Sequence, residues 1–231
     1  MTLYAEYRHL GRMDYSEALE LQRNEFRRLS EGNAPEGCAG TIFTVEHPDV
    51  YTIGKHGNEN NLLVDEEVLR NMGARLFRTD RGGDITFHGE GQIVGYPVLN
   101  LALVNMGLRQ YIFTLEQAVI DTLARYGTES GRSEGASGVW TGGNVAGKGP
   151  LRKVCAIGVR ASRYITMHGF ALNVTTDLHR FEVINPCGFT DRGVTSMQRE
   201  LGYAPDIDEV RVKVVTRLAQ LLGAECRMMT K

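Results

Sequence analysis

The most informative stretch of the chain reads Arg81-Gly82-Gly83-Asp84-Ile85-Thr86-Phe87-His88-Gly89-Glu90-Gly91-Gln92. The paired glycines at 82–83 let the backbone pass close to a ligand and expose its N–H groups. Residues 84–88 and 93–101 are predicted strands on either side of the second pair of glycines. Arg81 could bind an anionic or carbonyl group there. A hairpin loop whose glycines serve only the turn explains this stretch equally well by itself, because short glycine motifs match by chance.

Hydrophobic spacing outside this stretch predicts further strands and helices. Strands are expected at 3–9, 41–46, 74–78, 138–141, 154–161 and 165–174, and helices at 14–29, after 65, at 108–126 and at 207–222. Strands that follow one another, with helices set apart from them, imply an α+β fold built on a mostly antiparallel or mixed sheet packed with helices. No repeat or linker divides the chain, so we expect one domain over residues 1–231.

The composition is that of a soluble globular protein, with 42% hydrophobic and 23% charged residues in a chain of 231. A net charge of −2 argues against nucleic-acid binding, which usually needs a basic domain. No apolar run is long enough to span a bilayer, and residues 1–13 lack the features of a secretory or transit peptide. We therefore expect a cytoplasmic protein that binds neither nucleic acid nor a membrane.

The cysteines are scattered, and they are Cys38, Cys155, Cys187 and Cys226. None forms a C-x-x-C pair, so neither a zinc site nor a redox motif is indicated, and no metal is expected. Cys187 has an unusual context, because it follows Asn185-Pro186 and precedes Gly188. A rigid turn of this kind could present N–H groups that lower a thiol pKa and stabilise an oxyanion. An inert buried thiol is otherwise the better explanation for a cytosolic cysteine.

Lys153 opens a predicted strand that is otherwise apolar. A solvated edge residue is the ordinary explanation of such a lysine, and the functional explanation makes it the ammonium partner of a thiolate. Alternation along the strand would place Lys153, Cys155 and Ile157 on one face. Another apolar strand, at 170–174, follows His168-Gly169 and either lines an acyl pocket or belongs to the core.

Taken together, these segments resemble the lipoyl(octanoyl) transferase family. The resemblance lies in residues 81–96 (R-G-G-x-x-T-F-H-G-x-G-Q-x-x-x-Y), Gly138-Val139-Trp140, Lys153 with 156–158, His168-Gly169 and Asn185-Pro186-Cys187-Gly188. The matches occur in the family's order and extend from about residue 41 to 188. Two departures leave the catalytic groups in place, since Glu90 stands where proline is common and Cys155 where a small residue such as alanine is usual.

The resemblance implies the fold of biotin/lipoate protein ligases and a Cys/Lys dyad, with Cys187 as the nucleophile and Lys153 as its partner. It assigns substrate binding to Arg81, Gly82, Gly83, Asp84, Ile85, Thr86, Phe87, His88, Ala156, Ile157, Gly158, Gly169, Phe170 and Ala171. The implied donor is octanoyl-acyl carrier protein, which brings its own phosphopantetheine, so no cofactor of the enzyme is expected. The implied acceptors are lysines of the lipoyl domains of 2-oxoacid dehydrogenases and of the glycine-cleavage H protein.

Two other functions fit parts of the sequence. An ATP-dependent lipoate or biotin protein ligase has the same fold and holds an acyl-adenylate with a glycine-rich loop and a lysine, but it needs no nucleophilic cysteine. The context of Cys187 therefore favours the transferase. A non-catalytic paralogue that only binds lipoyl domains or carrier proteins would have no reason to keep both Cys187 and Lys153.

Overall fold

The structure is a computed structural model that describes residues 2–146, 149–186 and 192–229. Its main feature is a large mixed sheet with the strand order β12-β1-β2-β6-β10-β9-β8-β7, in which β11 also pairs with β9. The strands of this sheet are β1 (Tyr4–Arg12), β2 (Cys38–Glu46), β6 (Gln92–Leu99), β7 (Gly131–Ser133), β8 (Ala136–Thr141), β9 (Arg152–Ser162), β10 (Ile165–Asn173), β11 (Gly193–Val194) and β12 (Glu225–Met228).

A second, small sheet has the order β4-β3-β5 and consists of β3 (Val50–Ile53), β4 (Arg75–Arg78) and β5 (Ile85–His88). The α-helices are α1 (Tyr15–Ser30), α2 (Glu66–Asn71), α3 (Leu108–Ala124), α4 (Gly143–Ala146), α5 (Met197–Leu201) and α6 (Ile207–Leu221). Two short 3₁₀ turns, η1 (Glu59–Asn61) and η2 (Leu178–Phe181), lie in the connections. Among the helices of the described ranges, none is long and apolar enough to cross a bilayer.

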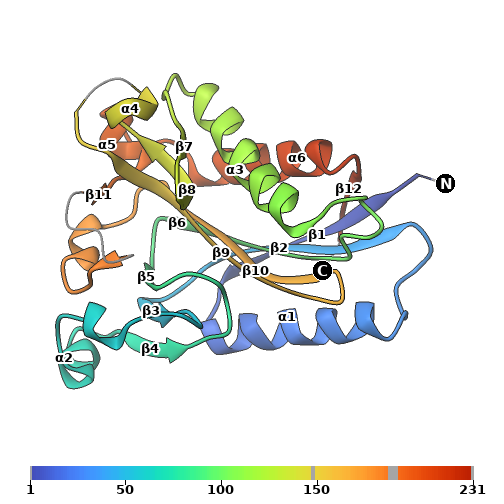
Figure 1. The fold of residues 1–231 in the computed structure, drawn as a ribbon, viewed down its shortest axis with the longest axis horizontal. Coiled ribbons are helices and arrows are strands. Elements are labelled where there is room, and N and C mark those ends of the chain that lie inside the picture. The colour runs from blue at the N-terminus through green and yellow to red at the C-terminus, as the bar shows by residue number, and fades with distance from the viewer. Residues whose placement is uncertain (1, 147–148, 187–191, 230–231) are drawn as a thin grey trace.

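The helices cover the two faces of the large sheet differently. Helices α3 and α6 pack on one face, whereas α1 and the small sheet lie against the other (Figure 1). The main core, with Leu115 and Leu218 at its centre, fills the space under α3 and α6. A smaller core forms beneath α1 around Phe43 and Tyr96. The central strands therefore pack against the main core with one face, and against α1 and the small sheet with the other.

The expected α+β class with a mixed sheet is confirmed, but the pairing around the glycines is not that of a hairpin. Strand β5 pairs with β3 in the small sheet, and β6 pairs with β2 and β10 in the large sheet. Gly89 to Gly91 therefore carry the chain from one sheet to the other. Gly91 needs its φ of 76°, and a Cβ there would lie 2.5 Å from Thr175 Oγ1.

Several elements differ from the predicted ranges. Strand β3 was not predicted, because its four residues are all buried and so show no alternation. Strand β2 begins at Cys38, three residues before the predicted start, because it is buried over most of its length. The edge strand β12 is short and largely exposed, and it pairs in parallel with β1. The helices predicted at 14–29 and 207–222 match α1 and α6 to within a residue at each end.

Candidate active site

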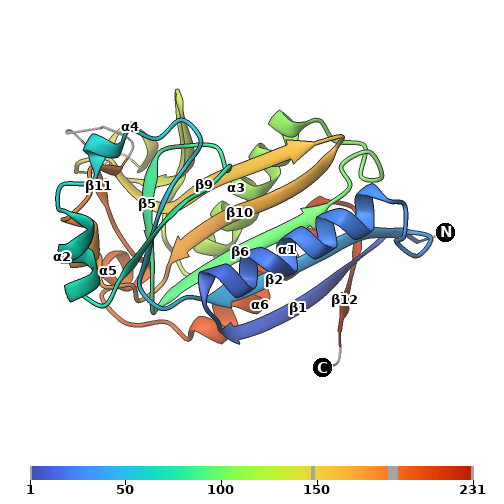
Figure 2. The ribbon, with the colours of Figure 1, turned by 90° about the horizontal axis from the view of Figure 1, so that it is seen from below.

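A cavity of about 410 Å³ lies between the central strands of the large sheet and the small sheet. This volume is in the range of small-molecule binding sites. Its floor is formed by residues of β6, β9 and β10, and β5 with Arg81, Gly83 and Asp84 contributes a wall. The small sheet lies on the face of the large sheet opposite α3 and α6 (Figure 2). Tyr15 of α1 and Phe181 of η2 also line the cavity.

The side chains of the floor change along the strands, from polar amides through small apolar residues to glycines. Its rows are Gln92 with Asn173, then Val94 with Ala171 and Ala156, then Gly169 with Gly158. Asn173 is four positions after Gly169 on β10, which corresponds to about 13 Å at the rise of a strand. The cavity thus has a polar end, an apolar middle and a flat end of glycines.

The glycine loop at 81–83 is pressed against the flat end of this floor. The N–H of Gly82 donates to the carbonyl of Val159 at 2.9 Å. A Cβ on Gly158 would lie 2.6 Å from the Gly82 oxygen, and a Cβ on Gly54 would lie 2.2 Å from the Gly83 oxygen. The loop therefore depends on close approach of its backbone to β9 and to the residue that follows β3.

Arg81 holds the same loop to β3. Its guanidinium donates to the carbonyl of Thr52 at 2.6 Å, to Thr52 Oγ1 at 3.0 Å and to the carbonyl of Asp84 at 2.6 Å. Burial makes these bonds valuable, because a buried guanidinium must have its N–H groups satisfied. The side chain also lines the cavity.

We expect Gly158→Ala to disturb the site more than the overall fold. The new Cβ overlaps the Gly82 oxygen, so the 81–83 loop must move away from β9, at a cost of about 1–3 kcal/mol in the free energy of unfolding. Urea denaturation and steady-state kinetics of Gly158→Ala measure both effects, and the KM for the substrate should rise. Gly107→Ala is the matched control, since nothing lies within 4 Å of a Cβ at Gly107. Equal behaviour of the two variants would contradict this account of the loop.

His168 fixes the other side of the loop. Its φ of 61° is left-handed, a conformation that costs a non-glycine residue of order 1 kcal/mol or more. Its N–H donates to Gln22 Oε1 at 2.9 Å, and its Nε2 bonds Asp80 Oδ1 at 2.8 Å. Asp80 also pairs with Arg160 at 2.7 Å, and the hydrogen bond from His168 helps to lower the pKa of this carboxyl. Since Asp80 directly precedes Arg81, the strained histidine secures the start of the glycine loop.

Two further buried histidines are neutral, namely His88, which lines the cavity, and His47. His88 Nδ1 bonds Gln92 Oε1 at 2.8 Å, and burial lowers the pKa of His88 to about 3. His47 Nδ1 donates to the carbonyl of Met13 at 2.7 Å, so its Nε2 accepts from the hydroxyl of Tyr96 at 2.8 Å. Burial lowers the pKa of His47 to about 4. These rings therefore serve as neutral hydrogen-bonding groups at physiological pH.

The buried histidines predict an acid-sensitive fold. A histidine whose folded pKa lies below its unfolded value of about 6.5 binds protons more readily when unfolded, so stability falls as the pH drops from about 6.5 towards 4. Each such histidine contributes a slope of about 1 kcal/mol per pH unit in that window. We expect urea unfolding at pH 7, 6 and 5 to show this slope, and His47→Gln to reduce it. The exposed His179 pairs with Glu182, and His179→Gln serves as the control for the substitution itself. An unchanged slope in His47→Gln would refute the assignment.

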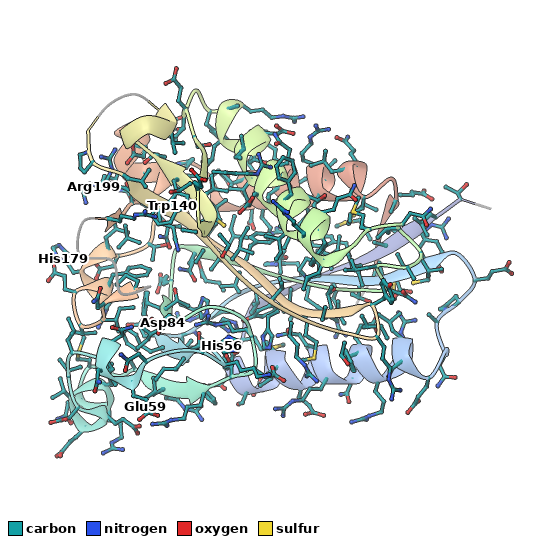
Figure 3. All side chains as sticks on the ribbon, in the orientation of Figure 1. His56, Glu59, Asp84, Trp140, His179 and Arg199 are labelled. Carbon is teal, nitrogen blue, oxygen red and sulfur yellow. The ribbon has the colours of Figure 1, made fainter. Side chains whose placement is uncertain are left out.

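Lys153 lies at the polar end of the cavity, near the start of β9. Its Nζ is 4.6 Å from the ring centroid of Trp140, a cation–π geometry. Its carbonyl accepts from the N–H of Thr195 at 2.9 Å, next to the pairing of Val194 with Lys153. In Figure 3, Trp140 lies on the β8 side of the site, whereas Asp84 is on the small-sheet side.

The expectation that Lys153 and Cys155 share a face is wrong, because β9 contains a bulge. Val139 pairs with Cys155, whereas the next residue, Trp140, pairs with Lys153, so Val154 is the extra residue. Lys153 consequently lines the cavity together with Ala156 and Gly158, whereas Cys155 belongs to the core under α3. Burial also raises the pKa of the Cys155 thiol.

We expect Cys155→Ala to retain activity within about threefold of wild type, since its thiol is fully buried and does not line the cavity. The loss should appear in stability instead, as the cost of removing a small buried group, about 1 kcal/mol. Steady-state kinetics and thermal unfolding of the variant measure the two effects. A loss of activity as large as that of Cys187→Ala would mean that the nucleophile is misassigned.

Of the predicted substrate-binding residues, all but two line the cavity. Gly82 holds the loop to β9, and Phe87 points into the core of the small sheet, where it packs tilted against Tyr51 and edge-to-face against Phe181. Ile157 and Phe170 border the cavity, although both also belong to the core under α3. Cys187 lies outside the described residues. Pro186, which precedes it in the sequence, lines the cavity.

The lining residues that were not predicted as site residues include Tyr15, Gln92, Tyr96 and Asn173. Gln92 and Tyr96 are in the matched motif and could have been selected by their two-residue spacing with Val94. Asn173 has the same parity as Gly169 and Ala171 on its strand. Within the described ranges, no group of three or more His, Cys, Asp or Glu residues could hold a metal ion.

Comparison with known proteins identifies a family and several close relatives. The family model of the lipoyl protein ligase A/B catalytic domain matches residues 14–219. An octanoyltransferase of Bacteroides fragilis is 50% identical over 209 residues, which cover 90% of this chain and 93% of that protein. An octanoyltransferase of Porphyromonas gingivalis is 49% identical over 222 residues, but the chain spans only 44% of that longer protein.

Solved structures share the fold. The bipartite lipoate protein ligase of Thermoplasma acidophilum superposes with a TM-score of 0.71 at 17% identity, covering 100% of this chain and 88% of that one. The biotin protein ligase of Aquifex aeolicus gives a TM-score of 0.53 at 17% identity, over 94% of this chain and 70% of that one. At such identities the likeness concerns the fold alone. The chain belongs to the lipoyl protein ligase A/B catalytic domain family, as a relative of its octanoyltransferase members.

Proposed function

We propose that the protein is a cytoplasmic octanoyltransferase that moves an octanoyl group from acyl carrier protein to a lysine of a lipoyl domain, through a thioester on Cys187. The observation that carries this proposal is that Lys153 and Pro186, the residue before Cys187, line the same cavity, which has a floor of small residues. The octanoyltransferases that share about half of its residues support the choice of acyl group.

The cavity suits a medium acyl chain with its carbonyl next to Lys153. An extended eight-carbon chain is about 9 Å long, at about 1.25 Å per bond along its axis, and the floor offers about 13 Å. The chain would lie over Val94, Ala156 and Ala171 and end towards Gly158 and Gly169. The apolar middle of the floor buries the methylene groups, each worth about 0.8 kcal/mol.

In the first step, the Cys187 thiolate adds to the donor thioester, and the tetrahedral intermediate collapses with loss of the phosphopantetheine thiolate. A new thioester bond to Cys187 forms, and the old one breaks. The Lys153 ammonium first stabilises the thiolate of Cys187 and then gives its proton to the leaving sulfur.

In the second step, the amine of the acceptor lysine adds to the acyl carbonyl. Lys153, now neutral, takes the proton of that amine, and the Cys187 thiolate leaves as the amide forms. The enzyme thereby returns to its initial state. Because a thioester is exchanged for an amide, the reaction is downhill, and it requires neither ATP nor a cofactor of the enzyme.

Intact-protein mass spectrometry tests this function. Wild type mixed with octanoyl-acyl carrier protein should gain one octanoyl mass that hydroxylamine removes, and added lipoyl domain should take up that mass. An ATP-dependent ligase would instead modify the lipoyl domain from free octanoate and ATP. A non-catalytic paralogue would modify nothing under either condition. Either of these last two results would overturn the proposed function.

A further inference from the structure

The side-chain amide of Asn173 has a fixed orientation at the polar end of the cavity. Asn173 is the last residue of β10 and is 3% exposed. Its Oδ1 accepts from Gln92 Nε2 at 2.8 Å, and its Nδ2 donates to the carbonyl of Thr195 at 3.0 Å. In the flipped orientation, the amide nitrogen would face the Gln92 nitrogen and the amide oxygen would face the Thr195 carbonyl oxygen. The hydrogen bonds therefore determine which atom is the nitrogen.

The side-chain amide of Gln92 is also fully hydrogen-bonded in this network. Both N–H groups of Gln92 are used, one for Asn173 Oδ1 and the other for the carbonyl of Phe87 at 3.1 Å. Its Oε1 therefore accepts from His88 Nδ1. The hydrogen bonds from His88 to Gln92 and from Gln92 to Asn173 therefore fix the orientation of the Asn173 amide.

Asn173 retains one N–H that this network does not use. An amide nitrogen carries two donors, and among the described residues the hydrogen bonds of Asn173 Nδ2 use one of them, on the Thr195 carbonyl. The side chain lines the cavity together with Lys153 and Pro186. A preorganised N–H donor at the wall of a cavity is the kind of group that stabilises an oxyanion.

Thr195 links this donor to the proposed proton carrier. Its carbonyl accepts from Asn173, and its N–H donates to the carbonyl of Lys153 at 2.9 Å. One residue thus ties the end of β10 to the start of β9. The side-chain amide of Asn173 and the backbone of Lys153 are therefore bonded to the same residue.

We propose that Asn173 is a catalytic residue whose remaining Nδ2–H stabilises the oxyanion on the acyl carbonyl in both tetrahedral intermediates. The inference rests on the proposed function. When a thiolate or an amine adds to the carbonyl carbon, the C=O electron pair moves to oxygen, which becomes an alkoxide. It returns when the leaving sulfur departs, so the donor is needed twice and no proton is transferred to Asn173.

Asn173→Asp tests this role with the least change of shape. Its carboxylate can still accept from Gln92 Nε2, but it places an acceptor where the donor was. The rate constants of Cys187 acylation by octanoyl-acyl carrier protein and of transfer to the lipoyl domain should both fall by about 10²–10³-fold. Asn173→Ala should show the same fall. Asn100→Asp is the matched control, because Asn100 accepts from the N–H of Ala102 through an oxygen that aspartate keeps.

Alkylation of Cys187 by iodoacetamide separates this role from a structural one, since that reaction forms no oxyanion. Its rate should remain within threefold of wild type in both Asn173 variants, whereas inhibition by octanal, whose thiohemiacetal mimics the intermediate, should weaken at least tenfold. Acylation within tenfold of wild type, or alkylation slowed as much as acylation, would overturn the inference. The proposed function is judged separately, because it fails only if the wild type itself gains no octanoyl group.

Discussion

Cys187→Ala is expected to gain no octanoyl mass and to lose at least about 10⁴-fold in turnover, the scale seen when a covalent nucleophile is removed. The methyl group that remains cannot form a thioester, so donor and acceptor could react only with each other. The measurements are intact-protein mass spectrometry after mixing with octanoyl-acyl carrier protein, and the rate of lipoyl-domain modification.

Cys226→Ala is the control for Cys187→Ala. Cys226 is a half-buried free thiol on the edge strand β12 and does not line the cavity. This variant should be acylated and turn over like the wild type. A hydroxylamine-labile adduct that persists in Cys187→Ala would show that another residue carries the acyl group.

Lys153→Arg is expected to form the acyl-enzyme but to transfer the acyl group about 10²–10⁴-fold more slowly, the usual value of general acid–base catalysis. The positive charge near the nucleophile is retained, so acylation continues, with the leaving group departing as a thiolate. An arginine does not lose its proton in a protein and so cannot take one from the acceptor amine. Mass spectrometry over time should therefore show the acyl-enzyme accumulating.

Lys213→Arg provides the matched control for this substitution. Lys213 is on α6, on the face of the sheet away from the cavity, and pairs with Glu209. It should turn over normally. If Lys153→Arg also turned over normally, the proton-transfer role of Lys153 would be wrong, and its contribution would be limited to charge.

Much of the fold could be predicted because long helices and alternating strands leave periodic patterns, as in α1 and β10. The arrangement of β5 and β6 could not, since nothing in Gly89-Glu90-Gly91 indicates that the strands beside it belong to different sheets. That choice is made by partners far away in the sequence, namely β3 for one strand and β10 for the other.

The candidate site, too, could be predicted only in part. Motifs identified the glycine loop, Lys153 and the floor of β9 and β10, because these residues form contiguous segments. Asn173 was missed because its role depends on a hydrogen bond to Gln92, 81 residues earlier, and on the carbonyl of Thr195. Such contacts exist only after folding, and residue type alone does not reveal them.

The extra residue at Val154 also affects how related chains should be compared. The bulge changes the phase of β9 by one residue between Lys153 and the floor at Ala156. A homologue that keeps the same number of residues but pairs β9 without the bulge would direct the aligned lysine into the core beneath α3. A homologue that lacks one residue here would keep its lysine on the cavity face by plain alternation. The spacing from the lysine to the Ala-Ile-Gly segment therefore indicates an intact site only together with the pairing of β9, because a three-residue spacing places the lysine at the cavity only when the strand is bulged.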